Sequence, residues 1–164
     1  MLERALVAGT FAAAIGSGLV AGIFFAFSTF VMAALGRLAP DQGMAAMNAI
    51  NVTVINPLFM LAFLGTGGLC LALALASWGS WGQVDGLLLL AAAVLYLIGC
   101  VGVTMVCNVP LNDALAAAPA GGAAALALWA DYLRTWTFWN HVRTLASLGA
   151  AIAFVAVLML GRDR

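Results

Sequence analysis

The chain has 164 residues, of which 66% are hydrophobic and only 7% are charged. About a quarter of the residues in a soluble domain are charged, so this composition predicts an integral membrane protein that contacts the lipid bilayer. The formal net charge is zero, which gives no basis for nucleic-acid binding.

Four apolar segments are long enough to cross a membrane as helices, because a hydrocarbon core of about 30 Å needs about 20 apolar residues. The predicted spans are residues 5–36, 55–77, 87–109 and 138–160. The first exceeds the apolar core of a signal peptide, about 7–15 residues, so we expect a retained helix that tilts or protrudes.

The predicted fold is a single all-α domain over residues 1–164, an up-and-down four-helix bundle with helical extensions on one side of the membrane. Lipid permits only helices or closed barrels, and these continuous apolar runs do not alternate as barrel strands do.

Small residues recur every four positions along the first span, which favours close helix packing in lipid. They form two rows: Ala5, Gly9, Ala13, Ser17 and Ala21, and then Ala14, Gly18, Gly22 and Ala26. One row could face the bundle and the other a second subunit, or both could be internal. A homo-oligomer is therefore left open.

The polar side chains gather in two long connections. Pro40-Asp41 begins the first and is typical of a helix start, whereas Asn56 precedes a proline, which disfavours helix there. In an up-and-down bundle both connections lie on one side, while the short "WGSWGQVDG" turn lies on the other. The side chains expected at this shared mouth are Asn48, Asn51, Asn56, Asn108, Asn112 and Asp113.

One stripe of the last helix carries the chemistry-bearing side chains. No glycine or proline interrupts residues 123–148, so one helix is predicted to run from outside the membrane into it. At about 100° per residue, the stripe contains Trp129, Tyr132, Trp136, Asn140, Arg143 and Ser147, with Trp139 at its edge. His141 projects off it, and Asp131 and Arg134 share the opposite face. The third span has a matching row of Tyr96, Cys100, Thr104 and Asn108.

Arg143 has two readings. It could snorkel to the headgroups beside interfacial tryptophans, a role we assign to Trp78 and Trp81 in the short turn. We favour an interior position, because ionisable groups in spans usually face the bundle. Asp113 is then its expected partner, and we expect Arg143, Asn108 and Asn51 to face one cavity.

The residue types restrict the chemistry. One histidine and no carboxylate within a span cannot form a two-histidine or carboxylate-bridged centre, so no metal site is predicted. Cys70, Cys100 and Cys107 lack CxxC spacing and are read as small core residues. A fixed cation, amides and aromatic faces suit a flat, apolar aromatic small molecule with a carbonyl or phenolate oxygen.

The motifs "NVPLND", "YLRTWTFWNHVRT", "FAFSTFVMAAL" and "MNAINVTVINPLF" resemble the anthrone oxygenase-like family of small four-span membrane proteins. Its named members oxidise anthrones to anthraquinones with dioxygen, without a metal or flavin, and many bacterial members have no assigned function. The resemblance implies a cofactor-independent oxygenase of an anthrone-like or phenolic substrate. The predicted location is the bacterial inner membrane.

This hypothesis assigns a role to each candidate residue. Arg143 would stabilise an oxyanion that Asn140 and Asn108 orient, and Asp113 would be the base. Trp136 and Trp139 would stack on the rings, while the remaining substrate-binding candidates are Asn51, Asn56, Asn112 and Tyr132.

Two alternatives remain. One is a non-enzymatic membrane protein: a small-molecule binder, a transporter subunit or an assembly factor. The other is a haem protein with His141 and a methionine such as Met32 or Met44 as ligands.

The arginines favour cytoplasmic termini. The side of the membrane that holds both termini has three arginines, Arg4, Arg162 and Arg164, which is one more than the opposite side if Arg143 is not counted.

Overall fold

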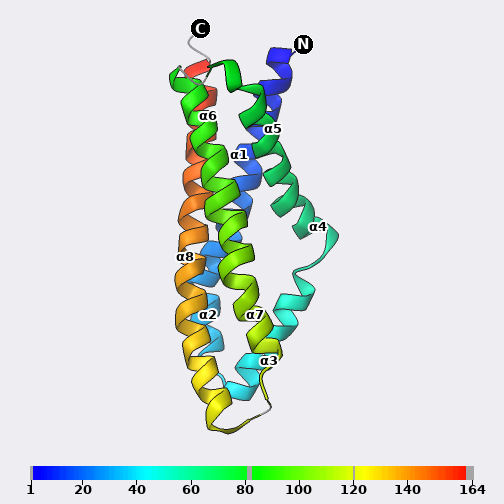
Figure 1. Cartoon of the computed structure of the whole chain (residues 1–164), viewed down its shortest axis with the longest axis vertical. Helices are drawn as coiled ribbons and strands as arrows, with labels where there is room; N and C mark the ends of the chain where they lie inside the picture. The colour runs from blue at the N-terminus through cyan, green and yellow to red at the C-terminus, as the bar shows by residue number, and fades with distance from the viewer. Residues whose placement is uncertain (1, 81–82, 120, 162–164) are drawn as a thin grey trace.

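The computed structural model describes residues 2–80, 83–119 and 121–161, and these form helices and turns arranged as a four-helix bundle (Figure 1). Three residues with predicted roles, Trp81, Arg162 and Arg164, lie outside the described residues. The helices run up and down, so the two ends of the chain lie at the same end of the bundle. The predicted fold class is confirmed.

The first three long helices are each built from shorter pieces, and the fourth is continuous. The first is α1 (Leu2–Ala26), a π-helical turn (η1, Phe27–Val31) and α2 (Met32–Leu35); α3 (Pro40–Thr53) follows it outside the second helix. The second is α4 (Pro57–Met60), a π-helical turn (η2, Leu61–Gly65) and α5 (Thr66–Ala76). After a 3-10 turn (η3, Trp78–Ser80), the third is α6 (Val84–Val94), two π-helical segments (η4, Leu95–Gly102; η5, Thr104–Asn108) and α7 (Val109–Ala116). The last is α8 (Gly122–Leu160).

Local chemistry explains where these helices begin. Pro40 occupies the first turn of α3, where its missing N–H costs nothing. Asn56 is extended, with φ −124° and ψ 158°, and its side chain caps α4. Gly121 and Gly122 have φ of 76° and 84°, a region that favours glycine, and they reverse the chain between α7 and α8.

The third helix does not end near residue 109, where the predicted span ends. It continues through Pro110 as α7, directly after a π-helical segment. Such local π adjustments satisfy the backbone groups that a proline leaves unpaired, so a proline need not end a membrane helix. The second polar connection is therefore largely helical.

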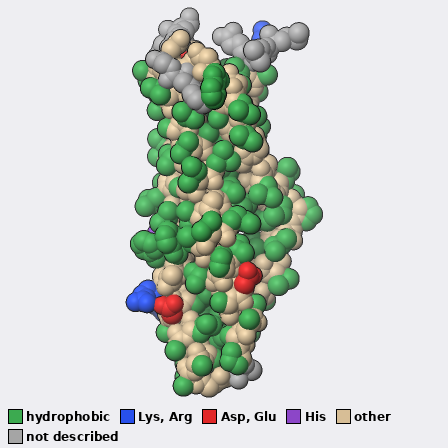
Figure 2. Space-filling model, in the orientation of Figure 1, with side chains coloured by type: hydrophobic (Ala, Val, Ile, Leu, Met, Phe, Trp, Pro, Cys, Tyr) green, Lys and Arg blue, Asp and Glu red, His purple; other side chains and the backbone are tan. Residues whose placement is uncertain are grey.

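The second helix indicates where the hydrocarbon core lies. All four helices are long and apolar enough to span a membrane, and Pro57–Ala76 has 20 residues, which at about 1.5 Å each match a core of about 30 Å. The others have 32, 33 and 39 residues and are longer than the core requires. We infer that α3, α7 and the first half of α8 form an extension outside it. In Figure 2 the coloured acidic and basic side chains lie in the lower third and at the upper tip.

Two apolar cores stabilise the bundle. One, at membrane level, is built around Phe24, Phe63, Tyr96 and Phe154. The other fills the extension and includes Met47, Leu115, Trp129, Tyr132 and Trp136. Of the small residues on α1, Ala13, Ser17 and Ala21 are buried, whereas Gly18 and Gly22 face outward. Whether a second subunit covers that outer face stays a prediction.

Gly99 marks a close approach between the third helix and α8. A Cβ at this position would lie 2.6 Å from the Cβ of Ala146, so the helices would have to separate. We expect Gly99→Ala to destabilise the protein by roughly 1–3 kcal/mol, the usual cost of overpacking. Thermal unfolding in detergent measures this. Gly18→Ala is the control, since its Cβ meets nothing within 4 Å; equal unfolding temperatures for both variants would contradict the close contact.

Candidate functional site

Arg143 lies inside the bundle rather than at the lipid surface. Its side chain is only 4% exposed. Nη2 donates to Oδ1 of Asn140 at 2.7 Å, and Nη1 donates to Oγ1 of Thr104 at 3.2 Å. The interior position predicted for Arg143 is confirmed, and its Nε–H remains without an acceptor among the described residues.

Two aromatic rings enclose the guanidinium group. Its central carbon lies 4.2 Å from the ring centroid of Phe24 and 5.0 Å from that of Trp136. Electron-rich ring faces stabilise a cation, and more so where water is excluded. The charge is therefore accommodated by rings and amide oxygens.

Asn140 connects this cation to the first helix. Its Nδ2 donates to the backbone oxygen of Phe24 and to Oγ of Ser28, both at 2.7 Å, while its Oδ1 accepts from Arg143. Thr144 adds a contact of 3.1 Å to Ser28. Because the amide is fixed at both ends, it holds the guanidinium group in one orientation.

A second amide fixes the rings beside the cation. Oδ1 of Asn112 accepts from the hydroxyl of Tyr132 and from Nε1 of Trp136, each at 2.8 Å. Nδ2 of Asn108 donates to the backbone oxygen of Trp136 at 3.2 Å. Trp136 also packs against Tyr132, with ring centroids 6.1 Å apart. Trp136 is thus held from its side chain and its backbone.

Arg143, Asn112 and Trp136 line a cavity of about 270 Å³, near the lower end of the range for ligand sites. Its polar wall consists of Asn51, Thr104, Asn112 and Arg143. The rest is apolar and includes the aromatic side chains Phe24, Phe27, Phe59, Phe63 and Trp136. Nδ2 of Asn51 has no partner among the described residues, which leaves a second buried donor in this wall.

A family model for anthrone oxygenase matches residues 59–153, more than half of the chain. The chain belongs to the anthrone oxygenase family. The matched residues include ten of the eighteen that line the cavity, Arg143 among them, while Phe24 and Asn51 lie before them. No curated protein and no solved structure matches the chain. Family membership supports an oxygenase-like function and leaves the substrate and the mechanism open.

Six predicted site residues do not line the cavity of this family member: Asn56, Asn108, Asp113, Tyr132, Trp139 and Asn140. Asp113 is exposed, and the one ion pair between described residues joins Arg134 and Asp131, so Asp113 does not pair with Arg143. The reason is α7: in a helix Asn112 follows Asn108 on the same face, and Asp113 is turned a further 100° away. Asn108 is buried behind Trp136 and is not in the wall.

Two further corrections concern Asn56 and Trp139. Asn56 is exposed, and its Oδ1 accepts from the backbone N–H of Phe59 at 3.0 Å, which makes it a helix cap. Trp139 is half-buried and packs edge-to-face on Phe138, outside the cavity. Neither residue is placed to contact a ligand in the cavity.

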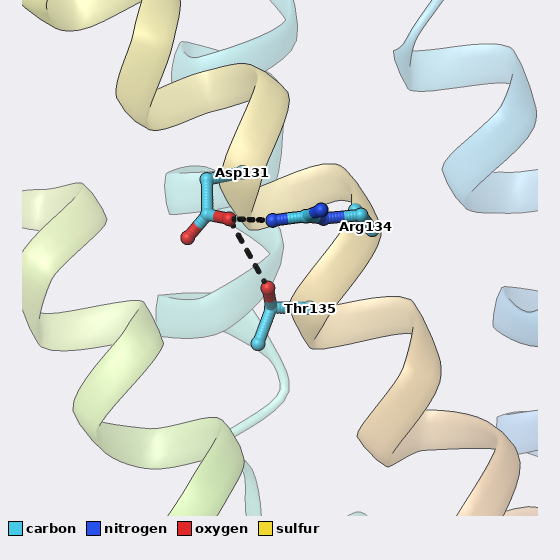
Figure 3. A network of polar contacts seen from close by, with 3 residues as sticks. All are labelled: Asp131, Arg134 and Thr135. Atoms are coloured by element: carbon cyan, nitrogen blue, oxygen red, sulfur yellow. Dashed lines mark hydrogen bonds and ion pairs between the residues drawn. The ribbon is translucent and has the colours of Figure 1, made fainter.

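The outward-facing residues of α8 lie as predicted. His141 is exposed, whereas Met32 and Met44 are buried in the core of the extension, so the three do not share an interior site. Asp131 pairs with Arg134 at 2.7 Å and also accepts from Thr135 at 3.4 Å (Figure 3). Among the described residues, no three His, Cys, Asp or Glu side chains gather as a metal site.

Sequence reasoning missed the first helix's part in the site. Phe24 covers the cation, Ser28 binds Asn140, and Phe27 lines the cavity. The four-residue spacing of Phe24 and Ser28 within "FFAFSTF" is the signal that could have found them.

Asn140 gives a test of this network. Asn140→Ala removes the acceptor of Arg143 and the donor to Phe24, and leaves both groups buried without those partners. We expect a loss of roughly 1–3 kcal/mol in the free energy of unfolding, measured in detergent. His141→Ala is the neighbouring control and should leave stability unchanged, because its side chain is exposed. A stable Asn140→Ala variant would mean that the network contributes little.

Proposed function

We propose that this protein is a cofactor-independent oxygenase that acts on a planar phenolic or anthrone-type small molecule in the cavity beside Arg143. The observation that carries the proposal is a buried cation, without a carboxylate partner among the described residues, in the short polar wall of a largely apolar cavity.

The charge of the wall favours an anionic oxygen. Nε of Arg143 and Nδ2 of Asn51 are both donors without partners, and both belong to residues that line the cavity. An oxyanion bound at this wall would neutralise the cation and accept from its donors. The aromatic side chains provide faces on which fused rings can stack.

The proposed reaction uses the reactivity of the substrate's own enolate. An anthrone loses a proton to give an enolate, which transfers one electron to dioxygen. The resulting radical and superoxide combine to form a C–O bond, and the protonated hydroperoxide loses water to give the quinone. In total, one anthrone and one dioxygen give one anthraquinone and one water.

Each wall residue has a role in this scheme. Arg143 stabilises the enolate oxygen, and Asn140 orients the guanidinium as a positioning residue. Asn51 donates a second hydrogen bond, while Trp136 and Phe24 enclose the rings. Asp113 is too exposed to be the base, so we propose that a water molecule held in the cavity takes the proton as Arg143 stabilises the anion, and returns it when the hydroperoxide forms.

Arg143 substitutions test the proposed oxyanion role. Arg143→Lys keeps a charge but loses the planar set of donors, so we expect oxygen consumption with 1,8-dihydroxyanthrone to fall roughly 10–1000-fold. Arg143→Met should be slower still, yet no less stable, since a charge is costly in a membrane helix.

Two controls and a stability measurement are needed to interpret the result. His141→Ala should turn over normally, and protein-free samples give the rate of spontaneous oxidation. If both Arg143 variants unfold early in detergent, the arginine is structural. If both stay folded and react at the unaltered rate, the oxyanion role is wrong.

A non-enzymatic binder or transporter subunit is the main alternative. It would bind 1,8-dihydroxyanthraquinone in the same cavity but would not raise oxygen consumption above the protein-free rate.

The absorbance spectrum of the purified protein tests the haem alternative. We expect protein absorption alone, because His141 is exposed, whereas Met32 and Met44 are buried in the core of the extension. A haem spectrum that disappears in His141→Ala would overturn the cofactor-independent reaction.

A further inference from the structure

The cavity has an open, apolar side between the second and third helices. Ile55, Leu64 and Met105 line the cavity, yet they are 72%, 53% and 59% exposed, so they form its rim. Figure 1 shows α4 leaning away from the lower part of the third helix, whereas α5 packs against α6 and η4. The rim therefore occupies the place where these two helices separate.

This opening extends into the part of the bundle that we place in the hydrocarbon core of the membrane. If the hydrocarbon core begins at Pro57, Leu64 lies about 10 Å inside it along the helix. Leu64 and Met105 are exposed apolar side chains on helices long and apolar enough to span a membrane, so acyl chains are the solvent expected around them. Arg143 is the only charged residue in the described cavity wall, and it is buried.

The route along the bundle axis is filled. Beyond the polar wall lies the core of the extension, where Met47, Leu115, Trp129 and Tyr132 are all buried. Trp129 and Tyr132 are stacked with ring centroids 5.7 Å apart. A flat molecule arriving from water at this end would have to displace that core, whereas one dissolved in the membrane meets only apolar side chains.

We propose that the ligand is a membrane-dissolved weak acid that enters sideways between the second and third helices, past Ile55, Leu64 and Met105. It crosses this portal as the neutral molecule and becomes the anion beside Arg143. This inference rests on the proposed ligand site but not on the oxygenase reaction.

The test narrows the portal and measures the binding rate in proteoliposomes. The probe is 1,8-dihydroxyanthraquinone, which cannot undergo the proposed oxidation and should quench the fluorescence of Trp136 when bound. The Trp136→Phe variant shows how much of the fluorescence change comes from Trp136. The portal variant is Leu64→Phe with Met105→Phe. The control is Leu61→Phe with Val106→Phe, whose positions are 71% and 75% exposed but do not line the cavity.

We expect the portal variant to slow association and dissociation together by about tenfold while the equilibrium affinity changes less than twofold, because a constriction acts on both directions. The control pair should bind at the unaltered rate. A ring-sulfonated derivative of the probe, which stays in water, should bind at least tenfold more slowly than the parent.

Each contrary result has a separate meaning. Equal rates for the portal and control pairs, or for the sulfonated and parent probes, would overturn sideways entry. Absence of Trp136 quenching in the unaltered protein would overturn the ligand site and the portal together. Normal portal behaviour without oxygen consumption would overturn the oxygenase reaction alone.

Discussion

The constraint on which the site depends is the burial of Arg143 in a membrane bundle. A cation inside a membrane span is costly, by about 2.5–3.5 kcal/mol or more at the centre of the helix, so its surroundings must compensate. Here Asn140 and Thr104 accept from it, and Phe24 and Trp136 face it. These partners come from three of the four helices, so holding one charge also fixes how α8 packs against the first and third.

The π-helical segments explain how apolar helices can present these groups. Phe27 in η1, Phe63 in η2 and Thr104 in η5 all line the cavity. A π-helical turn changes the register of the side chains that follow it, and such turns occur often at functional sites. Three helices thus redirect side chains around the same cavity.

The sequence predicted the last helix well, because its polar and aromatic residues recur with helical periodicity. Trp136, Asn140 and Arg143 are buried on one face, as expected. Asp113 was misplaced because a proline does not end the third helix. Phe24 was missed for a different reason: in a helix that is apolar on every side, periodicity does not distinguish the face toward lipid from the face toward the bundle. Only contacts between helices reveal it.

The buried cation and the lipid-facing portal together restrict the ligand more than either does alone. Crossing an apolar rim is costly for a permanent anion, whereas a molecule that never ionises gains no charge–charge attraction to Arg143. A weak acid avoids both costs: it crosses as a neutral molecule and releases its proton where the guanidinium stabilises the anion. Phenols and enolisable ketones have this property. The proposed site and portal therefore favour molecules that ionise beside Arg143, and in the proposed reaction an enolate formed there is the species that reacts with dioxygen.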